Sequence, residues 1–340
     1  MPAFLDDLRS LFQTQPAAPA PAQPAAPSAG ALPLPPTRSE QPDPSGSVQP
    51  EAAIEPRLLT VQCITSAGLH RIAYKEWGDP ANPDVLICAH GLTRASGDFD
   101  DLARAMAPHF RVACPDVAGR GRSDWLRDPM LYQVPMYVGD MVTLLARLNA
   151  NTVRWFGTSM GGLIGMGLAS LPGNPIMRLV LNDVGPILSG AGIARIGEYL
   201  SKPIRFKTFE EAEQYIRLIS LPFGPHSDAQ WRHITEVVIK QDGDEWITHY
   251  DPAIAIPFKA AANANPDGAD TVLWPVYDAI QCPTLSVRGE YSDLLTPATQ
   301  QEMATRGPKA KLVTIPGVGH APTFMHPEQI AIAKEFLLRP

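Results

Sequence analysis

The sequence predicts an α/β fold, in which a mostly parallel sheet is flanked by helices and carries an inserted helical cap. From about residue 57, short runs of apolar residues alternate with stretches of helical character. Continuous apolar strands separated by helices are typical of a parallel sheet that is covered on both faces. The alternation stops at Pro186 and resumes at Pro283, so we expect the cap over residues 187–276.

Each element of the sheet follows from a local pattern. The runs 57–65 and 70–77 flank a short turn and predict a β-hairpin. Further strands are expected over residues 84–90, 110–116, 153–156, 177–181, 283–288 and 311–315. Helices are expected over residues 99–107, 138–148, 160–171 and 327–338. Together with the cap, these elements form one predicted domain over residues 53–340.

The N-terminal part of the chain differs in composition from this domain. Residues 13–52 are dominated by proline and alanine and contain no aromatic residue, which predicts a disordered, semi-stiff linker. Within residues 1–12, Phe4, Leu8 and Leu11 recur at helical spacing and indicate a short amphipathic helix. This helix either docks on a partner or a hydrophobic surface, or is a frayed end that packs against nothing.

Charge and hydropathy exclude several functional classes. The 340-residue chain has 28 Lys and Arg against 35 Asp and Glu, a formal net charge of −7, so nothing attracts it to nucleic acid. Its apolar runs are much shorter than the roughly 18 residues of a membrane span. The N-terminus lacks the basic and apolar regions of a signal peptide. We therefore expect a cytoplasmic protein.

The four cysteines, Cys63, Cys88, Cys114 and Cys282, are far apart in the sequence. Each lies in or beside a predicted strand, and no pair has the close spacing of a zinc site or redox motif. We expect buried, reduced thiols and predict neither a metal nor a cofactor.

A Gly-x-Ser-x-Gly motif, Gly157-Thr-Ser-Met-Gly161, lies between a predicted strand and a predicted helix. In this context the motif places the serine on a sharp turn, where its hydroxyl stands clear of the backbone. The glycines are needed because side chains there would collide with the neighbouring strand and helix. We therefore expect Ser159 to be a nucleophile.

Other landmarks accompany this motif. They are His90-Gly-Leu92 after a strand, the loop Asp116-Val-Ala-Gly-Arg-Gly-Arg-Ser123, the turn Arg288-Gly-Glu-Tyr-Ser-Asp293, and the loop Gly317-Val-Gly-His320. With them, the region from about residue 57 to 340 resembles the α/β-hydrolase family, and in particular bacterial carboxylesterases. The first 52 residues have no counterpart in that pattern.

The resemblance implies a catalytic triad in the chain order serine, acid, histidine. His320 is the expected general base, because it alone of the eight histidines lies in a glycine-rich loop directly after a strand. Asp293 is the expected acid. Asp183, at the end of the sixth strand, is the alternative acid, and Glu290 is a further one.

The resemblance also implies an oxyanion hole made by the backbone N–H groups of Leu92 and Met160. Arg94 lies nearby and either meets a substrate carboxylate or pairs with Asp98 or Asp100. In the cap, Trp246 and Tyr250 are the candidates for substrate contact, because their segment is rich in polar aromatic residues.

The function that these expectations define is hydrolysis of carboxylic esters through an acyl-enzyme intermediate. The substrate is a small or oligomeric ester, and the resemblance extends to enzymes acting on polyesters or hydroxyacid oligomers. A lactonase, a C–C bond hydrolase or an acyltransferase would use the same triad. A non-catalytic receptor on this scaffold is disfavoured because every expected triad member is present.

Overall fold

The structure, a computed structural model, describes residues 55–190, 192–193, 200, 204–265 and 267–339. The predicted amphipathic helix and linker, residues 1–12 and 13–52, lie outside this part of the chain. Within it, no helix has the length and hydropathy needed to cross a membrane.

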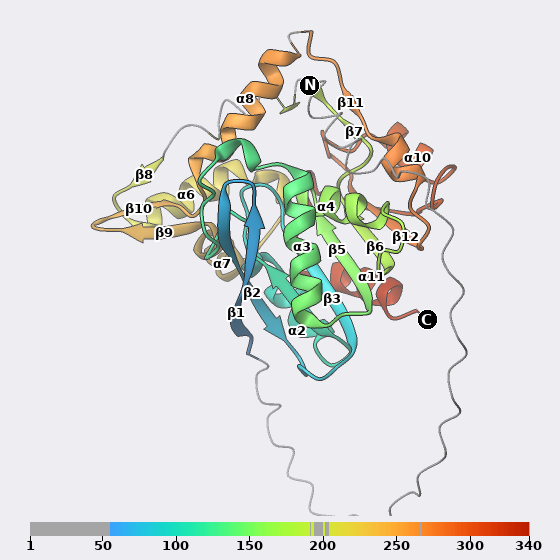
Figure 1. Ribbon diagram of the computed structural model, residues 1–340. Coiled ribbons are helices and arrows are strands. Elements are labelled where there is room, and N and C mark those ends of the chain that lie inside the picture. Colours follow the sequence, from blue (N-terminus) through green and yellow to red (C-terminus); the bar gives the residue numbers. More distant parts are fainter. Residues whose placement is uncertain (1–54, 191, 194–199, 201–203, 266, 340) are drawn as a thin grey trace, which may run out of the picture. The chain divides into compact units, whose positions relative to one another are not determined.

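An eight-stranded sheet forms the centre of the molecule, in the order β1-β2-β4-β3-β5-β6-β12-β13 (Figure 1). Its strands are β1 (Arg57–Thr65), β2 (Gly68–Trp77), β3 (Asp84–Ala89), β4 (Arg111–Pro115), β5 (Thr152–Thr158), β6 (Ile176–Asn182), β12 (Thr284–Gly289) and β13 (Lys311–Ile315). The hairpin β1–β2 and the pair β2–β4 are antiparallel, and the remaining pairs are parallel. All eight strands agree with the sequence prediction.

Helices cover both faces of the sheet because its central strands bury apolar side chains on both faces. Successive side chains of a strand point to opposite faces. In β3, Val85 and Ile87 belong to one core with α3 (Val134–Leu148) and α4 (Met160–Ala169). Leu86 and Cys88 belong to the other core, with α2 (Asp100–Met106) and α11 (Pro327–Leu337). Both cores are therefore assembled around one buried sheet.

Further elements lie between β6 and β12, and we call the described residues from 187 to 276 the cap. It contains β7 (Ile187–Leu188), β8 (Arg205–Phe206), α6 (Phe209–Ile219), α7 (Asp228–Val238), β9 (Ile239–Asp242), β10 (Glu245–Thr248), α8 (Ala255–Ala264) and β11 (Thr271–Val272). The short helix α9 (Trp274–Asp278) then leads into β12, and α10 (Pro297–Met303) lies between β12 and β13.

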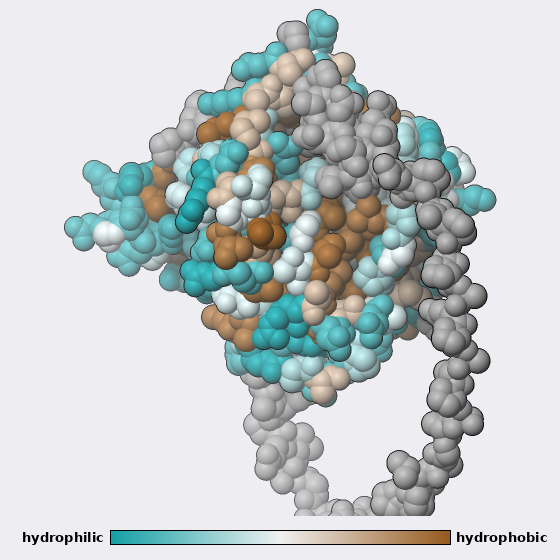
Figure 2. All heavy atoms as spheres, in the orientation of Figure 1, coloured by the Kyte–Doolittle hydropathy of each residue, from teal (hydrophilic) through white to brown (hydrophobic). Residues whose placement is uncertain are grey.

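The sequence predicted a helical cap, but the cap also contains strands. Strands β8, β10 and β9 form a small antiparallel sheet. The β9–β10 hairpin turns at Gly243, whose φ is +63°, and the flanking residues Asp242 and Glu245 pair directly. The two turn residues are therefore Gly243 and Asp244, and a Gly-Asp pair between two strands is a hairpin signal. Figure 2 shows this tip of the cap as strongly hydrophilic.

Two helices of the cap begin at side-chain caps. The hydroxyl of Thr208 accepts from the backbone N–H of Glu211 at the start of α6. Ser227 and Gln230 form a reciprocal capping box at the start of α7. Such caps satisfy N–H groups that have no partner within the helix. The two helices then pack through the cap's own apolar cluster, which includes Ile216, Trp231, Ile234 and Val238.

Candidate active site

Ser159 lies on the turn between β5 and α4, with φ 51° and ψ −115°. Left-handed φ values are uncommon outside glycine. Close packing around the turn makes the two flanking glycines necessary. A Cβ at Gly157 would lie 2.3 Å from the carbonyl oxygen of Gly161, and a Cβ at Gly161 would lie 1.9 Å from that of Ala89. The predicted strand–serine–helix turn is therefore present in the structure.

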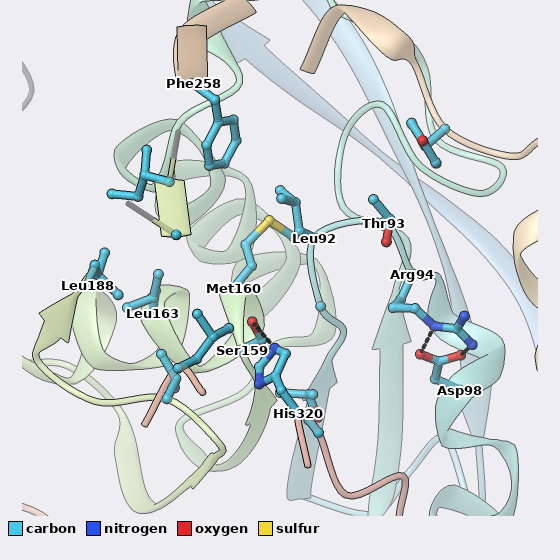
Figure 3. A pocket seen from close by; sticks show the side chains of 18 of the residues that line it. Leu92, Thr93, Arg94, Asp98, Ser159, Met160, Leu163, Leu188, Phe258 and His320 are labelled. Atoms are coloured by element: carbon cyan, nitrogen blue, oxygen red, sulfur yellow. Dashed lines mark hydrogen bonds and ion pairs between the residues drawn. The ribbon is translucent and has the colours of Figure 1, made fainter. Parts of the chain in front are cut away.

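His320 contacts the hydroxyl of Ser159, as Figure 3 shows. Its Nε2 lies 3.0 Å from Ser159 Oγ, and its Nδ1 lies 2.8 Å from Asp183 Oδ2. Because a carboxylate accepts hydrogen bonds, Nδ1 carries the proton and Nε2 is left to accept from the serine. This is the arrangement that serine hydrolases use to activate their nucleophile.

The carboxylate bonded to His320 is that of Asp183, the alternative to the expected acid Asp293. Asp183 follows β6 directly, is fully buried, and has φ 55°. Its second carboxylate oxygen accepts from the backbone N–H of Gly289 at 2.9 Å. This bond ties the acid to the end of β12, the strand that precedes Asp293.

Asp293 and Glu290 have other positions. Asp293 is exposed and lines the same cavity as Ser159. Glu290 accepts from the backbone N–H of Gly317 at 2.8 Å. The sequence led us to expect Asp293 and to keep Asp183 as the alternative, and β6 and β12 are neighbours whose carboxyl ends meet at one edge of the sheet. A carboxylate after either strand therefore lies near the histidine loop.

The turn His90–Leu92 is fixed by the imidazole of His90. The backbone N–H of Val117 donates to His90 Nε2 at 2.9 Å, so Nδ1 carries the proton and donates to the carbonyl of Gly91 at 2.7 Å. Burial lowers the pKa of His90, which favours this neutral form. These contacts hold the turn in place.

The two residues expected to form the oxyanion hole lie beside the nucleophile. Met160 is the first residue of α4, so its N–H has no partner within the helix. Leu92 and Met160 both line the cavity that holds Ser159, and Figure 3 shows their side chains next to each other. The helix N-terminus adds a partial positive charge at this point.

A cavity of about 1070 Å³ extends from Ser159 between the sheet edge and the cap. Its lining is mostly apolar and comes from both the cap and the elements around the central sheet. Contributors include Leu163 of α4, Leu188 of β7 and Phe258 of α8, which Figure 3 shows around the serine. Phe258 was not predicted from the sequence, because an apolar helix in the cap is equally consistent with a role in the cap's own core.

The structure separates the three substrate-contact candidates. Arg94 lines the cavity, but its guanidinium is paired with Asp98 at 2.6 Å, as the alternative reading anticipated. Tyr250 is buried and lines the cavity. Trp246 is not among the described residues that line it. Its ring packs edge-on against Phe209, with the ring centroids 5.2 Å apart.

Three residues that are able to ligate a metal lie together, two on the β1–β2 hairpin and one on α3. Cys63 pairs directly with His70, and His70 Nε2 lies 2.9 Å from Asp140 Oδ2 on α3. The ligand atoms of all three lie within 4.8 Å of one another, and all three residues are buried. Burial and the nearby Asp140 raise the pKa of Cys63 to about 12. The protonated thiol is the form expected of a hydrogen-bonded structural cluster.

The sheet order, the serine turn and the Ser159–His320–Asp183 contacts define a serine hydrolase architecture. A family model described as the alpha/beta hydrolase family matches residues 86–333. The chain belongs to this family, so the predicted fold and family are confirmed.

Two known proteins are particularly similar. A 3-hydroxybutyrate-oligomer hydrolase from Cupriavidus necator is 56% identical over 285 residues, which is 83% of this chain and 97% of that protein. The crystal structure of an alpha/beta hydrolase from Novosphingobium aromaticivorans has a TM-score of 0.73 and 38% identity, and it covers 84% of this chain and 98% of its own. The expected class of enzyme, an ester hydrolase, is thereby confirmed.

Proposed function

We propose that the protein hydrolyses 3-hydroxybutyrate oligomers through an acyl-enzyme on Ser159, with His320 as general base and Asp183 as the orienting acid. The observation that carries this proposal is the chain of contacts from Ser159 Oγ through His320 to Asp183, at 3.0 and 2.8 Å, at the end of a large apolar cavity. The 56% identical relative names the substrate class.

The mechanism follows from these positions. His320 Nε2 takes the proton of Ser159 as the hydroxyl oxygen attacks the ester carbonyl. Asp183 stabilises the imidazolium that forms, and the N–H groups of Leu92 and Met160 bind the oxyanion. His320 then protonates the departing alkoxide, which leaves as the hydroxyl end of the shortened oligomer. Water, activated by the same imidazole, releases the acyl group as a carboxylic acid.

The cavity supports an uncharged, extended substrate. Apolar side chains dominate its wall, and the guanidinium of Arg94 is already paired with Asp98. An internal ester of a hydroxybutyrate oligomer carries no charge, and its methyl groups are suited to an apolar wall. A volume of about 1070 Å³ exceeds that of a single ester group and leaves room for flanking units.

Action in the cytoplasm is part of the proposal. All four cysteines are free, and three of them are buried. Such thiols persist in a reducing compartment.

The test is a substrate panel on the full-length protein. We expect hydrolysis of linear 3-hydroxybutyrate dimers and trimers, measured by chromatographic release of 3-hydroxybutyrate. S159A should remove both this activity and covalent labelling by a fluorophosphonate. Cleavage of a lactone or a diketone in preference to the oligomers would contradict the proposed substrate. Absence of labelling in the wild-type protein would contradict the proposed nucleophile.

A further inference from the structure

Arg120, in the loop between β4 and α3, is one of the largest side chains that are fully buried. A guanidinium remains charged in proteins at all ordinary pH values. Burial of a charge without an opposite charge costs several kcal/mol. Within the part of the chain that the structure describes, no carboxylate forms an ion pair with Arg120. The burial of this charged side chain therefore needs a physical explanation.

Neutral groups surround the guanidinium. Nη1 donates to the carbonyl of Ala118 at 2.7 Å and to the hydroxyl of Tyr137 at 2.8 Å. The group also lies over the rings of Tyr132 and Tyr137, with centroid distances of 5.7 and 5.2 Å. These contacts solvate the cation without a direct ion pair, because the carboxylate of Asp251 accepts from the hydroxyl of Tyr132 and not from the guanidinium.

The remaining two contacts go to the residues that flank the oxyanion position. Nε donates to the carbonyl oxygen of Leu92 at 2.8 Å, and Nη2 lies 3.6 Å from the sulfur of Met160. The carbonyl of Gly91 is held by His90 and by the N–H of Arg94. The Gly91 carbonyl shares its peptide plane with the Leu92 N–H, and Arg120 holds the next peptide plane, so the turn is fixed on both sides of the Leu92 Cα.

We propose that Arg120 is a positioning residue for ester hydrolysis: its side chain holds Leu92 and Met160 in the geometry of the oxyanion hole, and its buried charge favours the negative transition state. This inference rests on the proposed function. An oxyanion that forms in a water-excluded site is stabilised by fixed positive groups far more than in water. Because no described carboxylate forms an ion pair with Arg120, its positive charge can stabilise the negative charge that develops on the oxyanion during the reaction.

The backbone of the loop is held independently of the side chain. Arg120 pairs with Tyr250 of the cap in an isolated bridge. The N–H of Gly121 donates to the carbonyl of His249, and the N–H of Asp251 donates to that of Gly119. Because these backbone bonds remain when the side chain is changed, substitution of Arg120 tests the guanidinium and not the path of the loop.

The experiment compares R120M with R122M. Arg122 lies in the same loop but is exposed, so both variants lose one positive charge. We measure kcat and KM for a short p-nitrophenyl ester, and the inhibition constant of a trifluoromethyl ketone, which forms a tetrahedral oxyanion on the serine. For R120M we expect kcat to fall about tenfold to a hundredfold, with KM changed less than about threefold. The inhibition constant should rise by a similar factor, while R122M matches the wild type.

The outcomes separate this inference from the proposed function. Wild-type protein that neither cleaves esters nor binds the ketone contradicts the proposed function. An active wild type together with a folded R120M of unchanged kcat and inhibition constant overturns the role of Arg120. Should R120M fail to fold, R120Q, which keeps donors but no charge, is judged by the same criteria. Failure of both variants to fold also overturns the inference, because Arg120 would then be structural.

Discussion

At the scale of single residues, the carboxylate of Asp183 is completely buried and accepts hydrogen bonds from two N–H groups. One oxygen faces the Nδ1 of His320, and the other accepts from the backbone of Gly289. Hydrogen bonds of this kind stabilise a buried carboxylate and fix its direction. The imidazole is consequently held in the tautomer that accepts the proton of Ser159.

Asp183 and Asp293 give a matched pair of substitutions. D183N keeps the shape of the side chain but removes its charge and reverses the tautomer preference of His320. We expect kcat for ester cleavage to fall on the order of 10³–10⁴-fold. D293N should keep at least about a tenth of the wild-type rate. Steady-state kinetics of the two variants check this, and the opposite order of the two losses would restore Asp293 as the acid.

The histidine, the nucleophile and the oxyanion turn were all predictable from local sequence, whereas the acid was not. Ser159 and His320 each lie in a glycine-rich turn directly after a strand, and that local pattern identifies them. The acid depends on which of two adjacent loops points at the imidazole, which is a property of tertiary structure. Arg120 gave no sequence signal either, because a loop arginine is usually exposed.

At the scale of elements, the turn between β5 and α4 is the most tightly packed feature of the site. Gly161 approaches the backbone of β3 so closely that a Cβ would lie 1.9 Å from the Ala89 carbonyl oxygen. Backbone atoms have little freedom to move away, so the strand and the helix would have to separate.

This packing predicts opposite effects for two alanine substitutions in neighbouring helices. G161A should lower the free energy of unfolding by about 2–3 kcal/mol or more and abolish activity. G139A lies in the exposed interior of α3, where a Cβ meets no atom within 4 Å. It should raise stability by roughly 0.5–1 kcal/mol. Urea denaturation measures both, and a G161A variant with wild-type stability would contradict the packing argument.

The strands of the central sheet were more predictable than the elements of the cap. A strand buried on both faces is a continuous apolar run, and each such run in β3 to β6 was visible. In the cap, β8 has only two residues and β9 is largely polar. The pairing of β9 with β10 comes from the Gly243-Asp244 turn and from the apolar cluster of the cap, so hydrophobic periodicity did not predict it.

At the scale of the whole molecule, cap and sheet meet at the loop that carries His320. The N–H of Gly319 donates to the carbonyl of Pro222, and His226 Nε2 lies 2.9 Å from the hydroxyl of Thr323. Burial lowers the pKa of His226, and the neighbouring His326, with ring centroids 4.8 Å apart, lowers it further. Burial likewise lowers the pKa of His249.

The lowered pKa values of His226 and His249 predict a loss of stability in mild acid. The unfolded chain binds a proton at each histidine near the ordinary pKa of 6.5, and the folded chain binds it only at lower pH. The free energy of unfolding should therefore fall as the pH drops from about 7.5 through 6.5 and below. Urea midpoints at pH 7.5 and 5.0 measure the loss, and H226Q should show a smaller one. An equal loss in H226Q would exclude His226 as a contributor.

The acid's position before the cap, at the end of β6, has a consequence for how this enzyme diversifies. Ser159 and Asp183 follow consecutive strands that are hydrogen-bonded to each other, so no part of the roughly ninety-residue insertion separates them. Changes of length inside the insertion leave the spacing of nucleophile and acid untouched. The nucleophile and the acid can therefore keep their mutual position while the inserted lid changes, whereas the histidine loop has to adapt to the lid that it contacts.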